Sequence, residues 1–208
     1  MSEEEERDPL DLPTEQLRED AFKLFGETKY VRAEKIEEVR QALKDVDCGE
    51  FDQSDANIVR YLRGKKYNVE KAVTCITNRI KFNKEHPEWT SNLSPKEFET
   101  FFSMMTILPQ RDKENRVILL IRPGLFIRQC TKEFIRDYPF AMIRFNLWLN
   151  EALSMHPEIN VYGAVFIVSA KELTVWDAAT FSAVAKVDER AAFFRYLFSC
   201  TPMRVGKR

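Results

Sequence analysis

Residues 57–89 constrain the fold more than any other stretch, because they predict two helices joined by a tight basic turn. The apolar positions of the first helix are Ile58, Val59, Tyr61 and Leu62, and those of the second are Val69, Ala72, Val73, Ile76, Ile80 and Phe82. Asn68 is suited to cap the second helix, with Glu70 favourably placed in its first turn. The second helix should end at His86, because Pro87 disfavours an α conformation in the residue before it. A helical hairpin is therefore predicted.

Three short segments of this hairpin carry a resemblance to a known family. They are Tyr61-Leu62-Arg63 at the end of the first helix, Lys66-Tyr67-Asn68-Val69 at the turn, and Pro87-Glu88-Trp89 after the second helix. In this order they resemble the small helical subdomain that opens CRAL-TRIO lipid-binding proteins, especially the tocopherol- and retinaldehyde-binding branch. The resemblance implies that an α/β lipid-binding domain follows.

The composition is that of a globular protein, with 44% hydrophobic and 31% charged residues in a chain of 208. No apolar run reaches the length of a membrane span. The opening residues, MSEEEERD, are unlike a signal or transit peptide, so we expect a cytoplasmic protein. The four cysteines form no C-x-x-C pair and the two histidines lie far apart, so we expect reduced thiols and no metal site, cofactor or disulfide framework.

Charge is distributed unevenly along the chain. Residues 1–30 carry a net charge of −6, whereas residues 57–84 hold eight bases against Glu70, a net charge of +7. A basic patch of this kind can meet an anionic surface. It can equally be a solvated helix face, in which each base contributes only to solubility.

The first half of the chain is predicted to be helical. Residues 1–13 read as a disordered acidic lead, and residues 14–46 as one or two helices that begin at Thr14. After a loop around Gly49, the hairpin begins with Ser54 or Asp55 as its cap. A short helix from Ser94 to about Ser103 completes a helical subdomain over residues 14–103.

The second half, residues 104–208, changes character. Residues 116–122 and 161–169 are apolar runs that predict buried strands, covered on both faces, in a parallel or mixed sheet. A single long helix from about Lys132 to Ser154 connects them, which makes a βαβ unit. Another helix follows over roughly residues 186–199. The predicted fold class is therefore α/β, or α+β over the whole chain.

The resemblance also raises an expectation about the end of the chain. In CRAL-TRIO proteins the strand after this last helix leads to a mobile gate helix and a further strand, which close the ligand cavity. Here Arg208 comes only nine residues after Ser199. The lipid-binding domain is therefore expected to be C-terminally truncated.

The predicted helix of residues 132–154 is apolar on most of its circumference, so both of its sides need a cover. One cover is the sheet, and the other is either more protein or an apolar ligand. Asn146 and Asn150 lie one turn apart, on the arc shared with Ile143 and Leu153. They either orient the one polar group of an apolar ligand or face solvent or a loop.

We expect ten residues at a ligand cavity, all of them placed there by the resemblance except Ile143 and Leu147, which extend the apolar surface of the helix. They are Ile143, Asn146, Leu147, Asn150, Ala164, Phe166, Phe193, Tyr196, Leu197 and Met203. For each apolar member, an ordinary core position is an equally good interpretation, since the wall of an apolar pocket has the same kinds of residues as a hydrophobic core.

Two further features bear on the ligand. The second predicted strand ends in Ser169-Ala170-Lys171-Glu172, whereas the family usually has an acidic residue followed shortly by glycine, so the ligand's identity stays open. Arg204 matches a family position that contacts phosphoinositides such as phosphatidylinositol bisphosphate. Lys207 and Arg208 follow it, and arginine suits phosphate because its planar fork forms paired hydrogen bonds. The same three bases can also be a solvated tail.

The leading functional hypothesis is a monomeric carrier of a small hydrophobic ligand: a retinoid, a tocopherol or a phospholipid. The alternative is a non-catalytic adaptor that binds membranes or proteins without lipid cargo. An enzyme is not predicted, because the chain has no G-x-S-x-G, P-loop or G-x-G-x-x-G motif and no catalytic residues can be named. Nucleic-acid binding is not expected either, because the basic patch lacks interleaved aromatic residues or a known motif.

Overall fold

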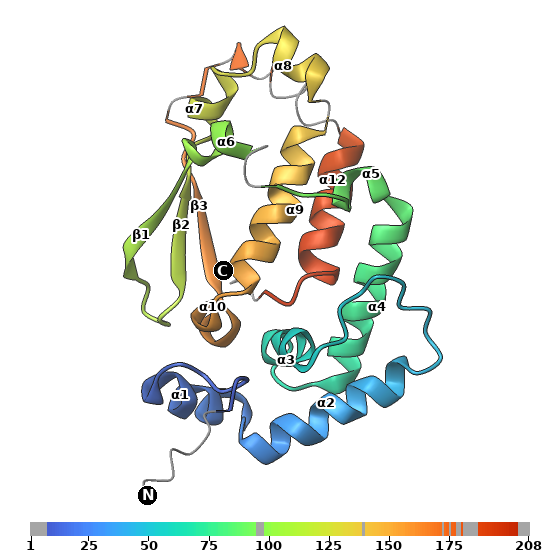
Figure 1. The fold of residues 1–208 in the computed structure, drawn as a ribbon. Helices are drawn as coiled ribbons and strands as arrows, with labels where there is room; N and C mark the ends of the chain where they lie inside the picture. Colours follow the sequence, from blue (N-terminus) through green and yellow to red (C-terminus); the bar gives the residue numbers. More distant parts are fainter. Residues whose placement is uncertain are drawn as a thin grey trace, which may run out of the picture.

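The computed structural model describes residues 8–94, 98–138, 140–171, 173–174, 176–177, 180 and 187–203. The first half is helical, as predicted (Figure 1). Its helices are α1 (Glu15–Phe25), α2 (Lys29–Leu43), α3 (Asp55–Gly64), α4 (Val69–Glu85), α5 (Pro87–Thr90) and α6 (Glu99–Phe102). Residues 14–46, predicted to form one or two helices, form two, α1 and α2. Helix α6 is shorter than the helix expected from Ser94. Residues 95–97 lie outside the described residues.

Side-chain caps explain where the four longer helices begin. The side chains of Thr14, Thr28, Ser54 and Asn68 each accept a hydrogen bond from the backbone N–H three residues on. This confirms Thr14 and Asn68 as caps and decides between Ser54 and Asp55 in favour of Ser54. Because each cap satisfies a backbone donor that the helix leaves unpaired, these boundaries are set locally.

The sheet has three strands, β1 (Met105–Arg111), β2 (Val117–Ile121) and β3 (Ala164–Val168), in the order β1-β2-β3. Strands β1 and β2 are antiparallel, and β2 and β3 are parallel, with Val117 opposite Ala164. The sheet is therefore mixed, and its parallel pair confirms the predicted βαβ unit. Strand β1 was not predicted. The other predicted strand starts three residues late, because Val161 and Tyr162 still belong to a helix, α10 (Pro157–Tyr162).

The prediction of one helix over residues 132–154 is wrong. Two helices occupy this stretch, α8 (Lys132–Asp137) and α9 (Ala141–Ser154). Tyr138, between them, has a φ of −129° and a ψ of 65°, outside the α region. This is the behaviour expected of a residue that precedes proline, here Pro139. The other helices of the second half are α7 (Pro123–Ile127) and α12 (Val187–Ser199), and α12 matches the helix predicted near residues 186–199.

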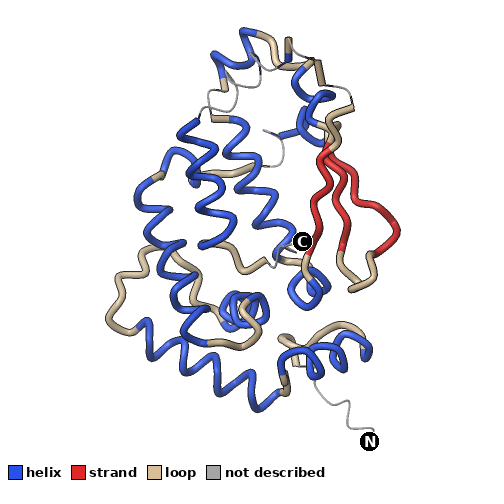
Figure 2. The backbone as a smooth tube through the Cα atoms, turned by 180° about the vertical axis from the view of Figure 1, so that it is seen from behind, coloured by secondary structure: helices blue, strands red, loops and turns tan. Residues whose placement is uncertain are grey.

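Helix α9 occupies the middle of the molecule. It lies between the sheet and α12, and α4 lies on the far side of α12 in both views (Figures 1 and 2). One apolar cluster joins the sheet to α9, and a second lies within α2, α3 and α4. A third cluster joins α4, α9 and α12 and so crosses the boundary expected near residue 103. The domain limits themselves stay predictions.

Two expectations about coverage need correction. The lead over residues 1–13 was expected to be disordered, but in residues 8–13 Leu12 is buried and Asp8 accepts a hydrogen bond from Leu10 N–H. Residues 1–7 lie outside the described residues.

Strand β3 was expected to be covered on both faces, yet Ile167 and Val168 near its end are exposed. In the described part of the chain, no helix has both the length and the apolar character needed to cross a bilayer.

Candidate functional site

Helix α9 presents two apolar stripes to two different clusters. Met142, Phe145 and Leu149 pack into the cluster against the sheet, which we call the sheet cluster. Ile143 and Leu147 pack into the cluster with α4 and α12, which we call the helix cluster. Helical periodicity places Asn146 and Asn150 between these stripes. The two asparagines therefore lie at the seam of the two clusters.

The ten residues expected at a ligand cavity divide between these clusters and the seam. Ile143, Leu147 and Tyr196 belong to the helix cluster, whereas Ala164, Met203 and the partly buried Phe166 and Leu197 belong to the sheet cluster. Asn146 and Asn150 lie at the seam, and the side chain of Phe193 lies outside the described residues. Nine of the ten are thus brought to one region around α9. Most of them are buried, as core residues would be.

Asn150 has an incomplete set of hydrogen bonds. Its side chain is buried, and its Nδ2 donates to the backbone oxygen of Asn146 at 2.7 Å. That acceptor fixes the orientation of the amide, because only the nitrogen can donate. Its Oδ1 then has no hydrogen-bond partner. Leaving a buried acceptor without a partner costs about 1–3 kcal/mol. Asn150 does not face solvent, and Asn146, which is half-buried, donates to the oxygen of Met142 at 2.8 Å.

A charged network that the sequence did not predict joins α9 to the helical half. Glu151 accepts a hydrogen bond from Arg60 of α3 at 2.6 Å and one from Arg79 of α4 at 3.2 Å. Arg79 also hydrogen-bonds the hydroxyl of Tyr196, and its guanidinium lies 4.9 Å from the centre of that ring. Burial alone would raise the pKa of Glu151, but the two guanidinium groups outweigh it and hold that pKa below its usual value. The only signal in the sequence is an acidic residue on a mostly apolar helix.

The chain is similar in sequence to known proteins. No protein-family model matches it. It is 28% identical over 149 residues to an "Alpha-tocopherol transfer protein-like" protein of Mus musculus, a match that covers 68% of this chain and 41% of the relative. The Homo sapiens protein of the same description is 26% identical over 149 residues, covering 68% of this chain and 42% of the relative. The chain thus spans about two fifths of the length of these relatives.

These relatives are CRAL-TRIO proteins. The resemblance to the CRAL-TRIO family is confirmed. It rests on part of the chain, and it leaves the ligand undetermined. The arrangement around α9 is therefore the candidate site of a CRAL-TRIO relative.

Four of the eight bases of the CRAL-TRIO-like hairpin make contacts inside the molecule. Arg63 is buried and paired with Glu27, while Lys65 donates to the backbone oxygen of Thr201. Arg60 and Arg79 bind Glu151, and Lys84 pairs with Asp47 at 2.7 Å. Arg60, Arg63, Lys65 and Arg79 thus have internal roles, whereas the pair of Lys84 with Asp47 is exposed. The three bases expected to contact phosphoinositides, Arg204, Lys207 and Arg208, lie outside the described residues.

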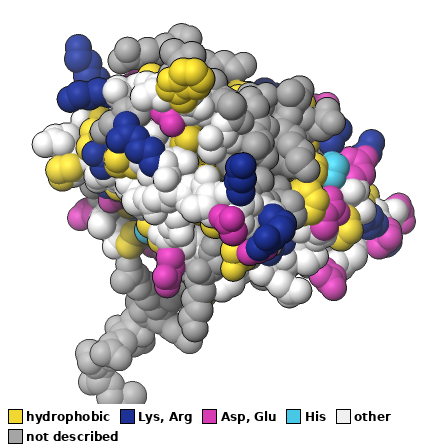
Figure 3. Space-filling view, turned by 90° about the horizontal axis from the view of Figure 1, so that it is seen from above, with side chains coloured by type: hydrophobic (Ala, Val, Ile, Leu, Met, Phe, Trp, Pro, Cys, Tyr) yellow, Lys and Arg dark blue, Asp and Glu magenta, His cyan; other side chains and the backbone are white. Residues whose placement is uncertain are grey.

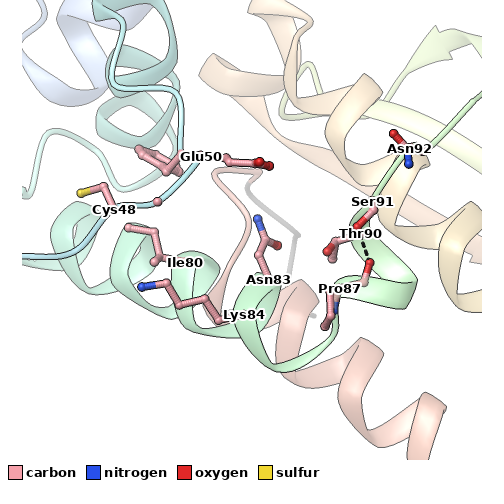
Figure 4. Close-up of a pocket in the computed structure, with 11 residues that line it drawn as sticks. Cys48, Glu50, Ile80, Asn83, Lys84, Pro87, Thr90, Ser91 and Asn92 are labelled. Atoms are coloured by element: carbon pink, nitrogen blue, oxygen red, sulfur yellow. Dashed lines mark hydrogen bonds between the residues drawn. The ribbon is translucent and has the colours of Figure 1, made fainter.

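Another hollow lies away from the candidate site. The loop before α3 and the ends of α4 and α5 surround a pocket of about 420 Å³ (Figure 4). Its walls are Cys48, Gly49, Glu50, Phe51, Ile80, Asn83, Lys84, Pro87, Thr90, Ser91 and Asn92. Lys84 donates a hydrogen bond to Asp47, and Ser91 donates one to the backbone oxygen of Pro87 at 2.5 Å. None of the ten expected ligand residues lines this pocket.

Large apolar side chains also reach the surface. Tyr138 and Trp176 are 51% and 87% exposed, and Phe194 and Phe198 of α12 are stacked with ring centres 6.4 Å apart and are also exposed. On the face seen in Figure 3, apolar side chains stand among charged ones of both signs. Scattered exposed apolar residues of this kind are common on globular proteins.

Proposed function

We propose that this protein is a non-enzymatic cytoplasmic carrier, which acts as a monomer and binds a small hydrophobic molecule around α9. The proposed ligand classes are retinoids, tocopherols and phospholipids. The binding residues are Ile143, Asn146, Leu147, Asn150, Ala164, Phe166, Phe193, Tyr196, Leu197 and Met203. Similarity to proteins described as tocopherol transfer protein-like supports this reading.

The observation that carries the proposal is the unpartnered Oδ1 of Asn150. Four other buried side-chain atoms of the described residues lack a partner, but only this one sits at the seam of two apolar clusters. An apolar molecule between the clusters would gain about 25 cal/mol per Å² of buried apolar surface. A ligand that carries one hydroxyl would also donate to Oδ1 and remove the cost of the unpaired oxygen. The arrangement therefore favours a ligand with one hydroxyl over one with no donor.

Contact with membranes is a second part of the proposal. Arg204, Lys207 and Arg208 would bind the phosphate groups of phosphoinositides, as paired donors to an anion. Their support is the match of Arg204 to a phosphoinositide-binding position of the family. Such a contact would bring the carrier to the surface from which it takes its ligand.

The test is a binding assay on the purified chain. Native mass spectrometry with organic extraction identifies any lipid that co-purifies. Titration with α-tocopherol, retinol and phosphatidylinositol then ranks the classes, and the methyl ether of α-tocopherol, which lacks the hydroxyl donor, should bind about tenfold more weakly than α-tocopherol itself. Vesicles with and without phosphatidylinositol bisphosphate test the membrane contact.

Two leucine variants sharpen this test. Asn150→Leu should abolish the difference between the hydroxyl and the ether, whereas Asn160→Leu should not. Asn160 is the matched control because it is equally buried and also has an unpartnered Oδ1, but it lies on α10, outside the proposed site. A folded chain that takes up no lipid from any class would contradict the carrier proposal and favour the adaptor.

A further inference from the structure

The chain segment that leaves α12, Ser199–Met203, crosses the helical half of the molecule, and we call it the strap. Its backbone oxygens are bound by side chains of α4 and of the residue after α3. Lys65 Nζ donates to the oxygen of Thr201 at 3.0 Å, and Cys75 Sγ donates to the same oxygen at 3.3 Å. Asn78 Nδ2 donates to the oxygen of Ser199 at 3.4 Å. The helical half therefore binds the strap through its main chain.

Gly64, the last residue of α3, lets the strap approach closely. A Cβ at this position would overlap the carbonyl oxygen of Pro202. The obstacle is backbone, so a side-chain rotation cannot relieve it. The backbone of Gly64 is helical and has no positive φ, so the close approach of the strap, and not the conformation of α3, requires glycine here.

The strap also connects the two clusters that flank α9. Cys200 is buried in the helix cluster, and Met203 is buried in the sheet cluster. Tyr196, one turn before the strap, is held by Arg79. Movement of the strap away from α3 would therefore draw side chains out of both clusters at once, on either side of Asn150.

We propose that the helical half acts as a latch: Gly64 and Lys65 hold the strap against α3, and its release opens the apolar region around α9 to a ligand. Gly64 and Lys65 are positioning residues in this arrangement, since neither belongs to the ligand site. Only the consequence of opening, which is entry of a ligand around α9, rests on the proposed carrier function. The contacts that close the latch stand independently of any ligand.

The cysteines report whether the strap is in place. Burial raises the pKa of Cys75 to about 11 and also raises the pKa of Cys200, so both thiols should react slowly while the strap is closed. A pocket of about 250 Å³ between α4 and α12 borders the strap at Ser199 and Cys200 and gives a reagent room to approach once the strap moves. Cys48 is buried in the same cluster of α2, α3 and α4 as Cys75 but makes none of the strap contacts named above, so it reports unfolding of the helical half.

The experiment measures maleimide labelling of each cysteine by mass spectrometry, on the full chain, for Gly64→Ala and Lys65→Met. Gly64→Ala should speed the labelling of Cys75 and Cys200 about tenfold while leaving Cys48 unchanged, because local opening exposes only the segment that moves. Lys65→Met removes one contact without adding an atom to the interface, and it should act in the same direction with a smaller effect.

The outcomes separate the latch from the carrier function. If both variants leave Cys75 and Cys200 as slow as in the parent chain, or if all the cysteines including Cys48 speed up together, the latch is wrong. If labelling changes as expected, the rate of α-tocopherol or retinol uptake is measured next, and faster uptake supports the link to ligand binding. Selective labelling without uptake of any lipid in parent or variants would keep the latch and contradict the carrier function.

Discussion

The two halves of the molecule differ in the kind of polar group that they bury. In the helical half, Glu27 lies between two buried arginines, accepting hydrogen bonds from Arg63 at 2.6 Å and Arg32 at 3.0 Å. In the α/β half the core is aromatic, and its buried asparagines, Asn150 and Asn160, each leave an oxygen unpaired. The helical half thus pairs its buried charges, although Tyr67 Oη and Trp89 Nε1 there lack partners, whereas the α/β half leaves the oxygens of two buried asparagines unpaired.

This difference fits a division of labour. A buried charge network with every member paired favours one arrangement, because any shift leaves a charge uncompensated in a dry interior. Apolar contacts are less directional, so an aromatic core accepts a guest more easily. The helical half is suited to serve as the rigid support, and the α/β half as the part that admits a ligand.

The largest effect is expected from Glu27→Ala. It leaves the guanidinium groups of Arg32 and Arg63 buried without their shared carboxylate, and removing one member of a buried ion pair costs about 3–5 kcal/mol. Urea unfolding followed by circular dichroism measures the loss. Glu19→Ala is the control, because the Glu19–Lys23 pair is exposed and should contribute well under about 1 kcal/mol. If the two variants unfold at similar urea concentrations, the charge network does not support the helical half.

Phe101→Ala tests the aromatic core of the α/β half, into which Phe101 packs from α6. Phe101 is fully buried, with ring centres 4.1 Å from Phe126 and 4.6 Å from Phe145. Truncating a buried phenylalanine costs about 3–5 kcal/mol, and the lower end is expected here if the aromatic core relaxes around the gap. Phe102→Ala, at a neighbouring and more exposed position, is the control. A loss for Phe101→Ala no greater than for Phe102→Ala would show that this core is not close-packed.

Glu151→Gln is expected to have a smaller effect, about 1–3 kcal/mol, because the carboxylate is partly exposed but accepts hydrogen bonds from two arginines. The pKa of Glu151 is lower in the folded chain than its ordinary value of 4.5. Its ionisation therefore stabilises the folded state fully above pH 4.5, and this contribution is lost as the pH falls through the folded pKa.

The pH dependence provides a check on that expectation. Between pH 7 and pH 3, the parent chain should lose more stability than Glu151→Gln, measured as the difference in urea midpoint at each pH. Equal losses would mean that Glu151 does not join the two halves through its charge. A matched variant at an exposed acid of the same half, Glu133→Gln, should follow the parent chain.

The sequence predicted well the features that neighbouring residues determine. The caps at Thr14 and Asn68 and the turn before α4 depend on side chains within three or four positions, so the helical hairpin was recognised with its boundaries. Helix α12 and the parallel pairing of β2 with β3 were also predicted from apolar patterns. Pro139 indicates a break between α8 and α9, but the long apolar pattern on both sides of it favoured the prediction of one continuous helix.

Features that depend on distant partners could not be predicted. Strand β1 has mostly exposed side chains and gains its partner only through pairing with β2, so its sequence lacks an apolar signal. Glu27 and Arg63 are 36 positions apart, and Arg60 and Glu151 are 91 apart. Neither pair has a local spacing that would indicate contact. In the candidate site, the sequence indicated Asn146 and Asn150 only as polar positions on an apolar arc, because the unpaired oxygen of Asn150 depends on how α9 meets both clusters.

The smallest effect, and a stabilising one, is expected from Asn150→Leu without ligand. Leucine has a similar volume and removes an acceptor that is buried without a partner, so the free energy of unfolding should rise by about 1 kcal/mol. Urea midpoints of the delipidated chain measure it, with Asn160→Leu as the matched variant. If Asn150 Oδ1 serves ligand binding at a cost in stability, Asn150→Leu should raise the free energy of unfolding and weaken the binding of a hydroxyl ligand. If Asn150→Leu instead destabilises the chain, the oxygen is already satisfied, and the contrast between a helical half with paired buried charges and a receptive α/β half fails at the residue on which it most depends.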